Sequence, residues 1–156
     1  MNYLEVFFQL ILAIFLGGLV GIERSIAGKT AGLRTFALVS MGACLFVIIS
    51  KIVALDYFLK LNFDPLRVAS QIIVGIGFIG AGMIIFQQSK IQGLTTAAGL
   101  WVSAGIGMAI GFNLYLLALF ASLLTLFVLI ILWFFEEKVK EKTHLDEKAP
   151  SSKNLR

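Results

Sequence analysis

The stretch VASQIIVGIGFIGAGMIIF, residues 68–86, decides the fold of this chain. Its glycines at positions 75, 77 and 80 spell G-x-G-x-x-G, the pattern of a loop that binds a dinucleotide pyrophosphate. Such a loop follows a strand, opens a helix and has an acidic residue about 20 positions further on. The stretch itself carries no charge, and no acidic residue occurs between Asp64 and Glu136. The glycines therefore predict a membrane helix that packs closely against its neighbours, rather than a cofactor loop.

The composition is that of a membrane protein. Hydrophobic residues make up 59% and charged residues 14% of the 156 positions, whereas a soluble domain is about half apolar and about a quarter charged. One cysteine, Cys44, and one histidine, His144, are too few for a disulfide or a Cys/His metal site. The net charge of +4 resides in residues that flank apolar segments, as membrane orientation requires. We therefore expect no cofactor, no metal ion and no nucleic-acid partner.

Five segments have the length of a membrane-spanning helix, which needs roughly 20 apolar residues. They are Leu4–Ile22, Leu33–Ser50, Pro65–Phe86, Leu94–Gly111 and Leu114–Phe135. The sequence thus predicts an all-α, polytopic protein with a five-helix transmembrane domain over residues 1–135 and a polar cytoplasmic tail over residues 136–156. Asp64 is expected to cap the third helix and Asn113 the fifth. Residues 51–66 are expected to lie along the membrane surface as an amphipathic segment.

The distribution of lysine and arginine predicts the orientation. Ten of these residues lie in the first loop, the third loop and the tail, against three in the second loop and none in the fourth. Cytoplasmic loops carry the excess of positive residues. We therefore expect the N-terminus outside the cell and the C-terminus in the cytoplasm.

Small residues recur at helical spacing in three of the predicted spans. Helices in lipid associate by close packing, and small residues let their backbones approach. The predicted packing positions are Gly17 and Gly21 in the first span, Gly75, Gly77, Gly80 and Gly82 in the third, and Gly99, Ser103, Gly107 and Gly111 in the fourth. We expect the first four helices to form a glycine-packed bundle, the fifth to lie nearer the lipid, and the chain to form a homo-oligomer.

Three long motifs in this chain resemble those of the MgtC/SapB family of bacterial inner-membrane proteins. They are GLVGIERSIAGKTAGLRTFALVSMGA (18–43), RVASQIIVGIGFIGAGMI (67–84) and GLTTAAGLWVSAGIGMAIG (93–111). The resemblance implies a five-helix domain in the cytoplasmic membrane and a link to magnesium limitation, to stress survival and to restraint of the F-type ATP synthase. Longer members add a cytosolic ACT-like domain, and some have asparagine where this chain has Thr95. The chain therefore resembles the short, SapB-type branch.

The first motif places Glu23, Arg24, Lys29 and Arg34 at the cytoplasmic ends of the first two helices. Fixed charges among glycines can form a polar mouth that binds an anion, a lipid headgroup or a partner protein. An ordinary charged loop that obeys the orientation rule would have the same composition. Both interpretations remain open on the sequence alone.

Two further polar groups lie within the predicted spans. Arg67 and Gln71 are one turn apart on the third helix and are expected to form a polar cluster facing the bundle interior, although Arg67 could instead extend to the membrane surface. Thr95 and Thr96 begin the stripe that contains Ser103 and could line a narrow polar path. Their hydroxyls could equally bond to carbonyls of their own helix.

Three function classes can be compared. A non-enzymatic regulator acting through a membrane partner, such as the F-type ATP synthase, fits a compact bundle with a basic cytoplasmic end. The alternative is an oligomeric transporter or channel for Mg²⁺ or another small cation, but Mg²⁺ prefers carboxylate ligands and the spans carry none at mid-depth. An enzyme would need a nucleophile–base pair or a metal cluster, and the sequence offers no catalytic residue of this kind. We therefore expect a protein that is not an enzyme.

Overall fold

The computed structural model describes residues 2–57, 64–87, 90–136 and 138–139, so most of the predicted polar tail lies outside the described residues. Five helices are long and apolar enough to cross a membrane, which confirms the all-α, polytopic prediction. They are α1 (Tyr3–Ile26), α2 (Leu33–Tyr57), α3 (Pro65–Met83), α4 (Leu94–Gly111) and α5 (Tyr115–Phe127), the last continued by the π-helical turn η1 (Val128–Leu132). Two short strands, β1 (Ile85–Gln87) and β2 (Lys90–Gln92), join α3 to α4.

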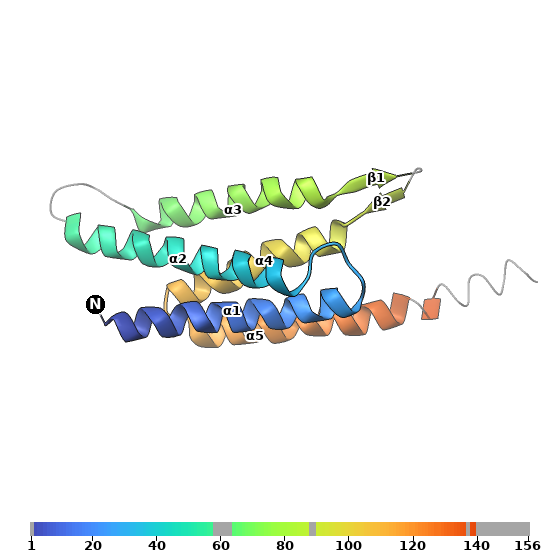
Figure 1. Ribbon diagram of the computed structural model, residues 1–156, viewed down its shortest axis with the longest axis horizontal. Coiled ribbons are helices and arrows are strands. Elements are labelled where there is room, and N and C mark those ends of the chain that lie inside the picture. The colour runs from blue at the N-terminus through green and yellow to red at the C-terminus, as the bar shows by residue number, and fades with distance from the viewer. Residues whose placement is uncertain (1, 58–63, 88–89, 137, 140–156) are drawn as a thin grey trace, which may run out of the picture.

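The helices run up and down along one long axis (Figure 1). The α1–α2 loop, the β1–β2 hairpin and the last turns of α5 lie at one end, which we call the hairpin end. The starts of α1 and α3 and the α4–α5 turn lie at the other, which we call the N-terminal end. Residues far apart in the sequence therefore meet at each end.

The centre of the bundle is built from α1, α2 and α4. Of the α4 span 56% is buried, against 17% each for α3 and α5. α3 packs on α2 and α4, as expected of a four-helix bundle, but it is no more buried than α5, so the fifth helix is not the only peripheral one. The large side chains Val74 and Phe78 of α3 are exposed, at 67% and 85%. A glycine pattern indicates where a backbone can be approached, but it does not indicate that the approaching group belongs to the same chain.

The two predicted helix caps have different outcomes. The Asp64 carboxylate accepts a hydrogen bond from the Leu66 amide at 2.9 Å, so it caps α3 as expected. Asn113 does not cap α5. It has a positive φ of 65° and ends α4: its amide donates to the Ile110 carbonyl at 2.9 Å, and the Leu114 amide donates to Ala109 at 2.8 Å. These two bonds form a Schellman motif, in which asparagine replaces the usual glycine.

Two predicted boundaries also differ from the structure. α2 continues as helix to Tyr57, so the first part of the expected surface segment at 51–66 belongs to a transmembrane helix, and residues 58–63 are outside the described residues. α3 ends at Met83 instead of continuing to residue 86. Ile85 pairs with Gln92 and Gln87 with Lys90 in an antiparallel hairpin. The chain then enters α4 through Gly93, whose φ of 89° suits glycine.

Candidate functional site

The first motif forms a tightly folded turn between α1 and α2. Gly28 has a φ of 66°, its amide donates to the Ser25 carbonyl at 3.1 Å, and the Lys29 amide donates to Arg24 at 3.0 Å. This Schellman motif ends α1. The Ser25 hydroxyl then accepts a hydrogen bond from the Leu33 amide at 2.9 Å, which fixes the start of α2. The turn is therefore held by bonds that its own residues make.

A partly buried ion pair lies in the last turns of α1, directly before this turn. The Arg24 guanidinium is bidentate to the Glu23 carboxylate, through Nε to Oε2 and through Nη2 to Oε1 at 2.6 Å. Only 4% of Arg24 is exposed, and bidentate geometry is the arrangement that makes such burial tolerable. Lys29 and Arg34 are exposed. We call these four residues the basic turn, because the single carboxylate is already paired with one cation and the other two cations remain on the surface.

The threonines that begin α4 lie at the same end of the bundle. Thr95 is exposed and Thr96 is buried. The stripe that continues from them is filled by α2: the Phe36 ring lies against Gly99, and the Ser103 hydroxyl donates to the Phe36 carbonyl at 2.9 Å. Within one chain, the narrow path expected along this stripe is therefore occupied by a fully buried aromatic ring.

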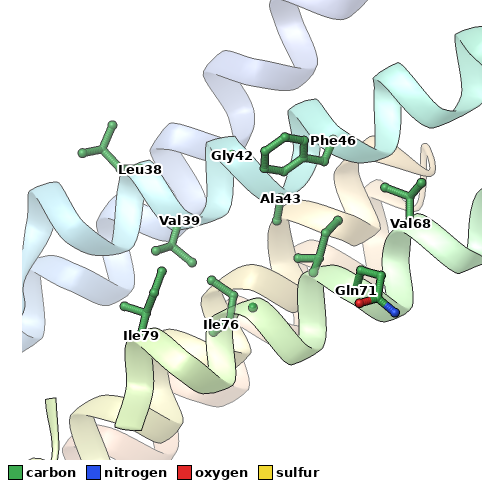
Figure 2. A pocket seen from close by; sticks show the side chains of 11 residues that line it. Leu38, Val39, Gly42, Ala43, Phe46, Val68, Gln71, Ile76 and Ile79 are labelled. Carbon is green, nitrogen blue, oxygen red and sulfur yellow. The ribbon is translucent and has the colours of Figure 1, made fainter. Parts of the chain in front are cut away.

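Arg67 and Gln71 lie at the N-terminal end of the bundle, away from the basic turn. Both are exposed rather than turned to the bundle interior, so the expectation of an interior polar cluster on α3 is wrong. Gln71 lines an apolar groove between α2 and α3, shown in Figure 2. The predicted ligand-binding residues thus divide between two separate places.

The predicted packing positions also divide into two groups. A methyl group added at Gly17 or Gly21 would lie 2.8 Å from a carbonyl oxygen of α2 or of the loop before it, and one at Gly111 would lie 2.7 Å from Val47. At Gly107 it would overlap the Ser40 carbonyl. Each of these four glycines therefore lies directly against a neighbouring segment.

The glycines of α3 behave differently. An added methyl group would meet nothing within 4 Å at Gly75, Gly77 or Gly82, and at Gly80 it would touch Ala97 at an ordinary 3.6 Å. The expectation that the first three pack against helices of this chain is wrong. Their backbone is open on the surface of the single chain.

A polar cluster at the N-terminal end was not anticipated from the sequence. The Gln9 amide, only 3% exposed, donates to the Ile110 carbonyl at 2.8 Å and to the Asn113 side-chain oxygen at 3.3 Å. The Asn113 amide in turn donates to Glu5 at 2.7 Å. Lys51 donates to the Gly111 carbonyl at 3.0 Å and to Asn113. One asparagine therefore ties α1, α2 and the α4–α5 turn together.

Two signals in the sequence could have indicated this cluster. Glu5 and Gln9 are four residues apart, on one face of α1, and Asn113 lies in a very short turn between two spans. The cluster includes one carboxylate, and the described residues contain no group of three or more metal-binding side chains. Its geometry is that of a structural tie between helices.

Comparison with known proteins places this fold in a family. Residues 10–138 match the MgtC family. The chain is 47% identical over 130 residues to YhiD of Escherichia coli (strain K12), whose name marks it as a provisional magnesium transporter. It is 43% identical over 124 residues to the protein MgtC of Salmonella typhimurium (strain LT2) and 38% identical over 130 residues to an uncharacterized protein of Haemophilus influenzae.

Each of these alignments covers 80% of this chain. It covers 59%, 51% and 54% of YhiD, MgtC and the Haemophilus protein, so the chain spans little more than half the length of its relatives. No solved structure gave a significant match. With five candidate spans and a family match over most of its length, the chain belongs to the MgtC family of multi-pass bacterial inner-membrane proteins.

Proposed function

We propose that this protein is a non-enzymatic regulator that acts on a membrane partner through the basic turn, in the physiology of magnesium limitation and stress. The observation that carries the proposal is the fixed geometry of that turn. Arg24 is buried against Glu23, while Lys29 and Arg34 stand exposed on a turn held by backbone bonds. A rigid surface with two free cations complements an acidic patch on another protein.

The arrangement of the core supports a regulator more than a conduit. α1, α2 and α4 meet backbone to backbone at Gly17, Ser40 and Gly107, and the Phe36 ring fills the stripe beside Gly99. A path for a hydrated ion would require these contacts to open, since Mg²⁺ gives up its water reluctantly. An interaction at the end of the bundle requires no such change.

The orientation, the partner and the assembly complete the proposal. The excess of lysine and arginine at the hairpin end would place the basic turn in the cytoplasm. The F-type ATP synthase is the first partner to test, because the family resemblance connects members with its restraint. We expect the chain to act as a homo-oligomer.

The experiment compares charge reversals at the same end of the bundle. Lys29→Glu combined with Arg34→Glu should abolish co-purification of the cross-linked ATP synthase from membranes of cells grown in low magnesium. Lys138→Glu is the matched control, because Lys138 is exposed on the C-terminal extension of α5 but lies outside the basic turn. Equal recovery of the partner with both variants would contradict the proposal.

The second candidate function is transport of Mg²⁺ or another small cation, and the name of the Escherichia coli relative favours it. Since the interior of one chain is filled, the pathway would have to form between copies. Purified protein in liposomes loaded with a magnesium-sensitive dye distinguishes the two functions. Cation influx that disappears in Glu23→Gln supports transport, whereas no influx in protein that still binds its partner supports regulation.

A further inference from the structure

An apolar groove runs between α2 and α3. It has a volume of about 530 Å³ and is bounded by α2 on one side and α3 on the other (Figure 2). Gly42 on α2 and Gly75 on α3 both line it, and an added methyl group would meet nothing within 4 Å at either position. The hollow therefore exists because both helices lack side chains at these two positions.

The length of the groove matches one leaflet of a membrane. Along α3 its lining runs from Val68 to Ile79, which is about 16 Å at 1.5 Å per residue. The hydrocarbon core of a bilayer is about 30 Å thick, so the groove extends over about half of it. The groove begins at Val68, three residues after the first residue of α3, Pro65. The acyl chain of a lipid has about this length and also starts near the membrane surface.

The polar residues at the groove are placed at its surface end. Arg67 directly precedes Val68, is exposed, and makes no ion pair with any carboxylate in the described ranges. The nearby Asp64 carboxylate accepts from the Leu66 amide as the helix cap. Gln71, one turn below Arg67, is the polar side chain among the lining residues. A cation above an apolar groove complements an anionic amphiphile.

We propose that the α2–α3 groove binds one acyl chain of an anionic phospholipid, with Arg67 contacting the headgroup phosphate and Gln71 donating to the ester region. The lipid would lie in the leaflet on the N-terminal side of the bundle. Lysine and arginine near a membrane surface attract anionic headgroups, and arginine binds phosphate oxygens through two parallel N–H groups. This site is independent of the basic turn, which lies at the other end.

The test uses native mass spectrometry of the purified chain with equimolar phosphatidylglycerol and phosphatidylcholine that have identical acyl chains. The wild-type protein should retain phosphatidylglycerol about fivefold better. Arg67→Gln should remove this preference, and Arg67→Lys should keep most of it. Gly75→Leu should abolish retention of both lipids, because leucine would occupy the groove.

Gly77→Leu is the matched control. Gly77 lies on the same helix, is equally open, and is not among the groove residues, so this variant should retain lipid as the wild type does. Circular dichroism confirms that each variant remains folded. If the wild type and all variants retain both lipids equally, the protein is surrounded by lipid that binds without specificity, and the groove is not a lipid site. If Gly75→Leu dissociates an oligomer but leaves lipid retention unchanged, a second copy of the chain occupies the groove. Either result overturns the proposal.

Discussion

α3 and α4 lie side by side in the bundle, have 19 and 18 residues and contain four glycines each, yet the glycines do different things. On α4, Gly107 and Gly111 lie against the backbone and side chains of α2, at distances that leave no room for a methyl group. On α3, Gly75, Gly77 and Gly82 face open space. The same residue type closes the interior in one helix and leaves open backbone on the surface of the other.

The difference arises from where α4 is held. Ser103 joins α4 to the Phe36 carbonyl of α2, and Gln9 joins its last turn to α1. No side-chain hydrogen bond connects α3 to another helix in the described part of the chain: the Asp64 side chain caps α3, and the Ser70 hydroxyl donates to the Arg67 carbonyl of the same helix. Small residues permit close approach, and side-chain hydrogen bonds between helices add to it; α4 has both features, and α3 has only the small residues.

The largest effect is expected from Gly107→Ala. The new methyl group would overlap the Ser40 carbonyl, which belongs to helix backbone and cannot move aside as a flexible side chain can. Overpacking of this kind costs about 3 kcal/mol, so the free energy of unfolding should fall by that amount. Thermal unfolding in detergent, followed by circular dichroism, measures it. Gly105→Ala, two residues away in open space, is the control, and equal melting temperatures for the two variants would refute a closed α2–α4 contact.

The next effect is expected at Asn113, which anchors the end of α4. Asn113→Ala removes the bonds to Glu5, Gln9 and Lys51 and places alanine at a φ of 65°. Together these should lower the unfolding free energy by about 2 kcal/mol. Asn113→Gly keeps the backbone conformation and should lose about 1 kcal/mol, the contribution of the side-chain bonds alone. If both variants lose the same unfolding free energy, the positive φ at position 113 does not destabilise alanine relative to glycine.

The parts of the fold that depend on local sequence could be predicted. The five spans follow from apolar length, and the Asp64 cap follows from a residue type next to the start of its own helix. The buried Arg24 could be placed at the end of α1, but its bidentate pairing with the neighbouring Glu23 could not. Adjacent residues on a helix usually point in different directions, so only the three-dimensional structure shows that their charged groups meet.

The parts that depend on distant residues were beyond sequence reasoning. Gln9 and Ile110 are 101 residues apart, so nothing local indicates that they bond. The spacing of Gly75, Gly77 and Gly82 predicts a packing surface within the chain, because close approach of another helix is the common reason for glycine in a membrane span. The sequence shows that the backbone of α3 can be contacted closely at these glycines. Whether a helix of the same chain, a lipid or a second copy makes that contact depends on the positions of all the other helices.

A smaller effect is expected from Ser103→Ala. Its hydroxyl donates to the Phe36 carbonyl of another helix at 2.9 Å, and loss of this bond should lower the unfolding free energy by about 1 kcal/mol. Ser122→Ala is the control, because the Ser122 hydroxyl bonds to the Ala118 carbonyl of its own helix, α5. Its loss should have a smaller effect in the same thermal unfolding measurement. A larger loss of unfolding free energy for Ser122→Ala would mean that the hydrogen bond between α4 and α2 stabilises the protein no more than a hydrogen bond within α5 does.

The smallest effect, and the one of opposite sign, is expected from Gly77→Ala. The methyl group meets nothing within 4 Å, while alanine is a better helix former than glycine by about 0.5–1 kcal/mol. The variant should therefore unfold at a slightly higher temperature than the wild type, whereas the identical change at Gly107 lowers it. A fall in stability would show that the open face of α3 is covered in the purified protein. Repeating the measurement across protein concentrations identifies the cover, because destabilisation through a second copy disappears as dilution dissociates the oligomer, whereas destabilisation through lipid does not.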